Sequence, residues 1–310
     1  MERYIKEEEF PLKLSLLRKL GCVRKHIRGR DRLLDLFFPG GRRLLFEVPF
    51  GPYRYRGDAQ NEIDRSVLLY GAFSKAELAV LRNMAAYLGP ICTKICFLDV
   101  GANVGHHALF MSKYVDEVLA FEPEPNLCSA AKQKVEQNGL DNTRVMQIAL
   151  GCQNENRLFY PAMGSNMGTG SLVEGFNQNN RGDGILVAVH SGDDVLRALG
   201  GISCQIIKID VEGFELEVLK GLRETLHCYR PMVLLELWKS KFGNFTTIEE
   251  FRSLIYPNAE IYRLRGRNNG EYCLTAYKID EHETNTQVEL VILPSEHARF
   301  VDNYSRWPWL

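Results

Sequence analysis

The stretch CFLDVGANVG, residues 96–105, decides the fold of this chain. Its first half is a short apolar run typical of a buried strand, and its second half turns on the glycines at 101 and 105. A helical pattern follows, and Glu122 ends the next strand-like run. A strand, a glycine turn, a helix and an acid about 20 residues further on are typical of a Rossmann-like nucleotide-binding domain.

The residues that follow alternate between strand-like and helical segments. We predict further strands at 117–122, 144–150, 205–210 and 232–237, and helices at 125–138 and about 214–226. Nearly continuous apolar strands between helices predict a parallel sheet covered on both faces, which is a doubly wound α/β architecture. Ligands of such sheets bind at the carboxyl ends of the strands.

Composition narrows the class of protein. The 310 residues are 45% hydrophobic and 25% charged, as expected for a globular protein with a substantial core. The formal net charge of -1 gives no overall field that would attract nucleic acid, so we expect no nucleic-acid partner. The first residues are acidic where a secretory signal needs an apolar run, and no apolar stretch reaches membrane-spanning length, which predicts a cytoplasmic protein. The eight cysteines show no paired CxxC spacing for zinc or redox chemistry.

The turn at 101–105 departs from the dinucleotide fingerprint in a way that suggests its ligand. Asn103 stands where the fingerprint has its middle glycine, and a side chain there disfavours a close pyrophosphate. Asp99 adds a carboxylate at the strand end, which disfavours an anion. S-adenosylmethionine fits better, because it offers an ammonium for Asp99, a ribose diol for Glu122 and no pyrophosphate. A nicotinamide-dependent oxidoreductase stays as an alternative, as does a non-catalytic cofactor-binding module.

Three stretches carry a resemblance to a known family: FLDVGANVGHH (97–107), AFEP (120–123) and IKIDVEGFE (207–215). With these stretches the chain resembles the FkbM-type S-adenosylmethionine-dependent methyltransferases, over about residues 45–240 when YRYRGD (53–58) and YGAFS (70–74) are included. The resemblance implies a mostly parallel seven-stranded sheet of the methyltransferase type. It also implies O-methylation of a hydroxyl, commonly on a sugar or polyketide, so we expect a carbohydrate or similar polyhydroxylated acceptor.

The same resemblance implies a set of cofactor-binding residues. Asp99 to Gly105 would line the methionine end of the cofactor, Glu122 would hold the ribose hydroxyls, and the end of the third strand would flank the adenine. The full set is Asp99, Gly101, Asn103, Gly105, Glu122, Pro123, Ala149, Leu150 and Asp210.

The alternation Lys208-x-Asp210-x-Glu212 is the main candidate for catalysis. Residues two apart on a strand share a face, so these three groups would converge beside the cofactor. Either carboxylate could take the proton of an acceptor hydroxyl, while Lys208 would keep a carboxylate ionised and also lower its basicity, so that it could orient substrate instead. Helix capping is the structural alternative for both acids.

Other polar residues are weaker candidates. His190 follows an apolar run and could reach the strand ends, and either His106 or His107 could act from the start of the first helix. Glu236 is an acid late in an apolar strand. No metal is required, although Asp210, Glu212 and Glu236 could together bind a divalent ion.

The N-terminal region, residues 1–90, is predicted to be a cap that contributes to the acceptor site, and residues 91–310 the catalytic domain. Residues 13–43 carry ten Lys or Arg against two acids, which suggests peripheral contact with an anionic membrane or glycan. A solvated helix packed through Leu14, Leu17 and Leu20 is the alternative. The glycine-rich insertion at 163–171 is expected to form a loop over the cleft. The oligomeric state has no signature in the sequence.

Overall fold

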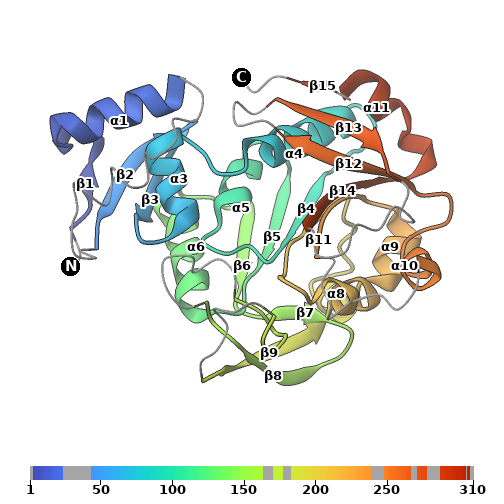
Figure 1. The fold of residues 1–310 in the computed structure, drawn as a ribbon. Helices are drawn as coiled ribbons and strands as arrows, with labels where there is room; N and C mark the ends of the chain where they lie inside the picture. Colours follow the sequence, from blue (N-terminus) through green and yellow to red (C-terminus); the bar gives the residue numbers. More distant parts are fainter. Residues whose placement is uncertain are drawn as a thin grey trace.

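A nine-stranded sheet forms the centre of the molecule, with helices on both of its faces (Figure 1). This computed structural model describes residues 3–23, 43–162, 170–176, 183–238, 248–266, 271–277, 287–304 and 306–307. The strand order is β15-β13-β12-β14-β11-β10-β4-β5-β6. The Rossmann-like α/β prediction is therefore confirmed.

The half of the sheet that matters for the site is parallel. Its strands are β4 (Cys96–Val100), β5 (Glu117–Phe121), β6 (Thr143–Met146), β10 (Ile206–Ile209) and β11 (Met232–Trp238). The helices that connect them are α5 (His106–Met111), α6 (Pro125–Gln137), α7 (Gly192–Ala198), α8 (Glu215–Gly221) and α9 (Arg223–Tyr229). The strand order reverses between β4 and β10, which makes their carboxyl ends the switch point where ligands of such folds bind.

The other half of the sheet is antiparallel and larger than expected. It contains β12 (Glu260–Gly266), β13 (Tyr272–Ala276), β14 (Gln287–Leu293) and β15 (Arg306–Trp307), with α10 (Ile248–Leu254) and α11 (Arg299–Tyr304) nearby. Among the described residues the sheet therefore has nine strands where seven were expected, and five of these nine are mutually parallel. The two extra strands, β13 and β15, continue the antiparallel edge beyond β12.

The predicted third strand, 144–150, is two strands in different sheets. β6 ends at Met146, and β7 (Ala149–Gly151) joins a second sheet with β9 (Ile185–Ser191) and β8 (Glu155–Phe159). β8 lies between the predicted strand at 144–150 and the predicted loop at 163–171, where no strand was predicted. α8 packs closely against β7, since a Cβ on Gly221 would lie 1.7 Å from the carbonyl oxygen of Gly151.

Two apolar layers, one on each face of the sheet, make up the core. Leu98 and Val100 point into one layer with residues of α8 and β9, while Phe97 points into the other with residues of α4 (Lys75–Leu88). Because both faces of β4 and β10 are covered, nearly every residue of these strands is apolar and buried. The polar exceptions are Asp99 and Lys208, and because burying a charged group costs free energy, each is expected to have an ionic partner or a function.

The N-terminal region forms a smaller unit with its own core. It contains β1 (Ile5–Lys6), α1 (Leu12–Val23), β2 (Leu45–Phe50), β3 (Tyr53–Asp58) and α3 (Glu62–Tyr70). This unit is fastened to the α6 side of the central sheet by a buried polar cluster, in which the ammonium of Lys134 lies 3.5 Å from Asp64 and 4.7 Å from the ring centre of Tyr55. α4 packs on the central sheet, so it brings N-terminal residues to the site.

Helix α1 packs on one face only. Leu14 is buried, whereas Leu12, Leu16 and Leu20 are 76%, 51% and 44% exposed. Most of the basic segment proposed to contact membranes, residues 24–42, lies outside the described residues, so this contact stays a prediction. Among the described helices, none has the length and apolar character needed to span a bilayer.

Candidate active site

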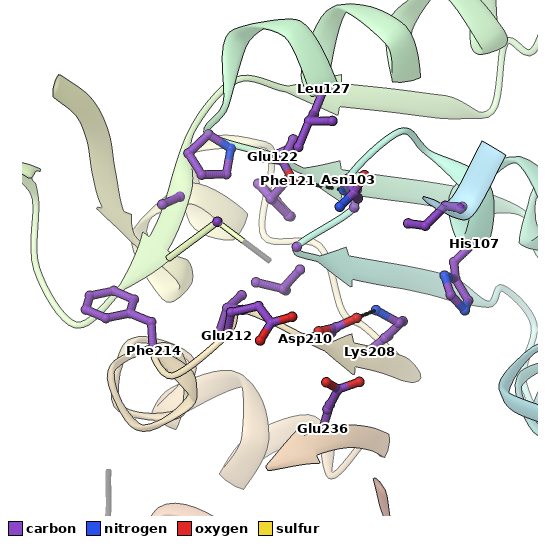
Figure 2. A pocket seen from close by; sticks show the side chains of 18 of the residues that line it. Asn103, His107, Phe121, Glu122, Leu127, Lys208, Asp210, Glu212, Phe214 and Glu236 are labelled. Carbon is purple, nitrogen blue, oxygen red and sulfur yellow. Dashed lines mark hydrogen bonds and ion pairs between the residues drawn. The ribbon is translucent and has the colours of Figure 1, made fainter. Parts of the chain in front are cut away.

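A cavity of about 410 Å³ opens at the carboxyl ends of β4, β5, β10 and β11 (Figure 2). It lies at the switch point of the sheet, where the topology predicts a ligand. Its wall also includes residues of α3, α4, β7, β8 and β14, together with Gly170 of the predicted loop and Leu172 just after it. The rest of the predicted lid, residues 163–169, lies outside the described residues.

The glycine turn after β4 is shaped by close backbone packing. Gly101 has φ of +83°, and a Cβ there would lie 1.8 Å from the carbonyl oxygen of Asp210. Only glycine allows the turn to pass this close to the end of β10. Asn103 also has a positive φ, 51°, and its Oδ1 accepts a hydrogen bond of 2.8 Å from the backbone of Val104.

Glu122 is held in place by the backbone at one end of the cavity. Its two carboxylate oxygens accept hydrogen bonds from the backbone N–H groups of Asn103 (2.8 Å) and Glu124 (2.9 Å). Burial raises the pKa of Glu122 to about 7, although these hydrogen bonds oppose the rise. A carboxylate oxygen has more than one acceptor site, so Glu122 can still receive two hydroxyl donors of a diol.

The wall beside Glu122 is apolar. It consists of Phe121, Leu127, Ala149, Leu150, Phe159 and Leu172. A flat aromatic base fits such a wall, as expected for Ala149 and Leu150. No described side chain of this wall carries an acid that would bind an adenine amino group.

Asp99 is buried directly beside Lys208, its cross-strand neighbour. Within the described residues neither oxygen of Asp99 has a hydrogen-bond partner of ordinary geometry. Burial raises its pKa, opposed by the charge of Lys208. It does not line the cavity, so it places negative charge beneath the site without touching the space inside. An unsatisfied buried carboxylate of this kind favours a cationic ligand nearby.

Lys208 and Asp210 form an ion pair on the cavity wall, 2.8 Å apart (Figure 2). Lys208 is only 2% exposed. Burial alone would lower the pKa of Lys208, but the neighbouring carboxylates of Asp210, Asp99 and Glu77 outweigh it and raise the pKa. The ammonium therefore stays charged and committed to Asp210.

Glu212 sits on a strained turn just after β10. Its φ is 48°, a left-handed value that is rare outside glycine, and the hydroxyl of Ser171 donates to its carbonyl oxygen at 2.5 Å. Burial and the nearby charge of Asp210 raise the pKa of Glu212 to about 9. Backbone strain at a cavity wall is a common property of functional sites.

Two more carboxyl groups face the same end of the cavity from the sheet. Glu236 of β11 and Glu289 of β14 are directly opposite each other in the antiparallel register. Burial raises their pKa values to about 10 and about 8. Carboxylate oxygens of Asp210, Glu212 and Glu236 lie within 4.8 Å of one another, so these three groups could hold a cation.

The two adjacent histidines at the start of α5 point in different directions. His107 lines the cavity, and its Nε2 lies 3.2 Å from Oε2 of Glu77 on α4. His106 instead packs against the rings of Phe50 and Tyr55, away from the cavity.

The structure brings most of the sequence-predicted residues to this one cavity. Those that line it are Gly101, Asn103, Glu122, Pro123, Ala149, Leu150, Lys208, Asp210 and Glu212. Asp99, Gly105 and His190 do not line it. Gly105 faces Ala131 of α6, where a Cβ would lie 2.8 Å away, and His190 lies on β9 beside Leu150.

Sequence reasoning missed three charged residues of the described cavity wall, Glu62, Glu77 and Glu289. Glu62 lies on α3 and Glu77 on α4, and nothing in a local helical pattern shows which end of the sheet such a residue would face. Glu289 lies on β14, a strand for which no prediction was made. The sequence of this strand, QVELVIL at 287–293, alternates between polar and apolar residues at its start, and this pattern could have predicted it.

Comparison with known proteins shows that the chain is similar to methyltransferases. The family model for the methyltransferase FkbM domain matches residues 99–268, which is more than half of the chain. The chain is 29% identical over 167 residues to Methyltransferase 1 of Beauveria bassiana, covering 48% of this chain and 67% of that protein. It is 29% identical to the hexuronic acid methyltransferase AglP of Haloferax volcanii (41% of this chain, 50% of that protein). It is 30% identical to the 2-O-methyltransferase NoeI of Sinorhizobium fredii (42% and 58%). The matched part thus spans half to two thirds of these relatives.

Proposed function

The chain belongs to the FkbM methyltransferase family, and on that premise we propose that it transfers the methyl group of S-adenosylmethionine to a hydroxyl of a carbohydrate or similar polyhydroxylated acceptor. The single observation that carries the proposal is the division of the cavity. One end has Glu122 with an apolar wall, and the other end gathers ionisable groups around Asp210. The relatives named for hexuronic acid and 2-O-methylation support a sugar hydroxyl as the acceptor.

The residues of the first end suit the cofactor. Glu122 would accept the two ribose hydroxyls, the wall with Ala149 and Leu150 would pack on the adenine, and the turn from Gly101 to Asn103 would approach the methionine part. The negative charges of the buried Asp99 and the half-buried Asp210 suit a cation. When bound, S-adenosylmethionine supplies an electrophilic methyl group on a positively charged sulfur.

The residues of the second end would bind and orient the acceptor. Asp210 is the carboxylate that the ammonium of Lys208 holds, so it can accept a hydrogen bond from a hydroxyl. Glu212 carries a proton at neutral pH, because its pKa is raised to about 9, and can therefore donate a hydrogen bond to another acceptor oxygen. Holding the hydroxyl in line with the methyl group supplies most of the acceleration in such a reaction.

Calorimetric titration tests the cofactor part of the proposal. We expect saturable binding of S-adenosylmethionine and S-adenosylhomocysteine, and no binding of NAD at the same concentrations. The Glu122→Gln variant should weaken both, whereas Glu136→Gln, an exposed position on α6, should not. Binding of NAD alone would overturn the proposal in favour of an oxidoreductase.

A screen of acceptors tests the transfer itself. Methyl hexopyranosides that lack one hydroxyl each are incubated with S-adenosylmethionine, and mass spectrometry detects the added methyl group. We expect methylation that disappears when one particular hydroxyl is absent. Cofactor binding without methylation of any hydroxyl compound would point to the non-catalytic binding module.

A further inference from the structure

His107 and Glu77 form a buried pair on the cavity wall that the mechanism above does not use. They come from α5 and α4, and their side chains approach to 3.2 Å. His107 is 5% and Glu77 6% exposed, and both line the cavity. Figure 2 shows His107 next to Lys208, at the end of the cavity where Asp210 and Glu236 also lie.

The neighbouring His106 lies in a different environment from His107. The ring of His106 lies among aromatic rings, with Phe50 at 5.0 Å and Tyr55 at 5.9 Å. Burial first, and then the proximity of His107, lower the pKa of His106 well below its ordinary value. One imidazole of the pair is therefore a core group, and the other is available to a ligand.

Glu77 is ionised in spite of its burial. Burial alone would raise the pKa of Glu77, but its contact with His107 and the charge of Lys208 lower it. A carboxylate accepts hydrogen bonds and cannot donate them, so Glu77 favours the tautomer of His107 with the proton on Nε2. In that tautomer Nδ1 keeps its lone pair.

We propose that His107 is the catalytic base that removes the proton from the acceptor hydroxyl, and that Glu77 is its positioning residue. This inference rests on the proposed methyl transfer. The hydroxyl oxygen bonds to the methyl carbon as the carbon–sulfur bond breaks, and the sulfur keeps the bonding pair. The hydroxyl proton moves to Nδ1, and Glu77 stabilises the resulting imidazolium, the arrangement found in nucleophile–histidine–acid systems.

The other ionisable groups of the cavity are less suited to this task. Asp210 is already engaged by Lys208 at 2.8 Å. Glu212, Glu236 and Glu289 have raised pKa values of about 9, 10 and 8, so each holds a proton at neutral pH. In this protonated form they can donate hydrogen bonds to the substrate, but they cannot act as the base that takes its hydroxyl proton.

Charged groups surround His107 on several elements. Glu77 faces it from α4, Asp99 from β4 and His106 from its own helix. Lys208 of β10 lines the same cavity as His107.

The first test reads the tautomer and needs no acceptor. Long-range ¹⁵N–¹H spectra of the ¹⁵N-histidine-labelled protein show which ring nitrogen carries the proton, and His107→Gln assigns the signal. We expect the Nε2–H form, and a mixture of the two tautomers in Glu77→Leu. A proton on Nδ1 in the wild type would overturn the proposal, whether or not an acceptor has been found.

The second test uses whichever methyl hexopyranoside the acceptor screen identifies. The His107→Gln variant places an amide near the Nε2 position, so it retains a contact to Glu77 but removes the base. We expect kcat to fall by about 10²- to 10⁴-fold with little change in KM or in the affinity for S-adenosylmethionine. Glu77→Gln should reduce kcat by about 10- to 100-fold, and Glu77→Asp should recover part of that loss.

Controls separate this inference from the proposed function. His227→Gln makes the same substitution on the exposed face of α9 and should leave kcat unchanged. If the wild type methylates sugars and His107→Gln does so at the same rate, the base is another group and the proposed function stands. If the wild type fails to bind S-adenosylmethionine, the proposed function itself has failed.

Discussion

The two ends of the cavity hold their carboxyl groups in opposite ways. Glu122 receives two backbone hydrogen bonds, from the glycine turn at Asn103 and from Glu124, so its position is fixed before any ligand arrives. Glu236 and Glu289 face each other across two strands, and burial, together with the nearby charges of Asp210 and Glu77, raises both of their pKa values. The end of the cavity at Glu122, the fixed end, is therefore preorganised for one ligand, the proposed cofactor. At the other end, around Asp210, Glu236 and Glu289, the protonation of the carboxyl groups can change with the ligand bound there, and we call it the responsive end.

The largest expected effect comes from breaking the fixed end at its backbone. In Gly101→Ala the new Cβ would lie 1.8 Å from the carbonyl oxygen of Asp210, at a φ of +83°. We expect a loss of about 2–4 kcal/mol in the free energy of unfolding, measured by urea denaturation, together with loss of cofactor binding.

Gly139→Ala is the matched control for that substitution. Gly139 has φ of +60° but open space around its Cβ position. We expect a loss of only about 1 kcal/mol, from the backbone conformation alone. Equal losses at the two glycines would contradict the close approach of the turn to β10.

Glu122→Gln tests the fixed end without disturbing its backbone. Since an amide can place only one acceptor oxygen among the two ribose hydroxyls, we expect S-adenosylmethionine affinity to fall by about 10- to 100-fold, roughly 1.4–2.8 kcal/mol. The wild type should bind more tightly at pH 8 than at pH 6, because the pKa of Glu122 is about 7 and its ionised form is the better acceptor. Calorimetry at both pH values should show a flat profile for the variant, and a flat profile for the wild type would refute the role of Glu122.

Glu236→Gln tests the responsive end and should stabilise the protein. The pKa of Glu236 is raised from an ordinary 4.5 to about 10, so the folded state binds this proton more tightly than the unfolded state does. Its contribution to stability is full below pH 4.5 and is lost as the pH rises towards 10. We expect the variant to gain about 1–2 kcal/mol at pH 8, and less at pH 6, in urea denaturation. Glu8→Gln, at an exposed site, should show no such dependence, and destabilisation of Glu236→Gln at pH 8 would argue against the raised pKa.

Glu289→Gln should act in the same direction with the smallest effect. The pKa of Glu289 is raised to about 8, so its destabilising effect stops growing above that pH, whereas that of Glu236 continues to grow. We expect a gain of about 0.5–1 kcal/mol that is the same at pH 8.5 and pH 9.5. A gain that keeps increasing over this range would mean that the two carboxyl groups titrate as one pair.

The contrast between the two ends also explains what the sequence could predict. The bounds of β4, β5 and α6 followed from apolar runs, glycines and a proline within a short stretch, and the residues of the fixed end belong to that stretch. The responsive end gathers side chains from α4, β10, β11 and β14, which are far apart in the chain. Their convergence depends on strand order and register, and these are properties of the folded sheet that no local pattern contains.

Two errors have the same origin. The break between β6 and β7 depends on which sheet each strand joins, and the run 144–150 carries no glycine or proline to mark it. The extra strands β13 and β15 were not predicted, because a half-buried antiparallel edge has a weaker pattern than a buried parallel strand.

The buried ammonium of Lys134 has a consequence for how this protein can evolve. Lys134 belongs to α6 in the Rossmann-like part, but its counter-charge, Asp64, belongs to α3 in the N-terminal unit. Because a buried cation without its partner is strongly destabilising, neither part can be exchanged for that of a relative on its own. The proposed positioning of His107 by Glu77, which belongs to α4 in the N-terminal region, would add a second reason. The two parts are expected to be inherited together, so changes of acceptor should arise by substitution within the cavity wall and not by recombination of modules.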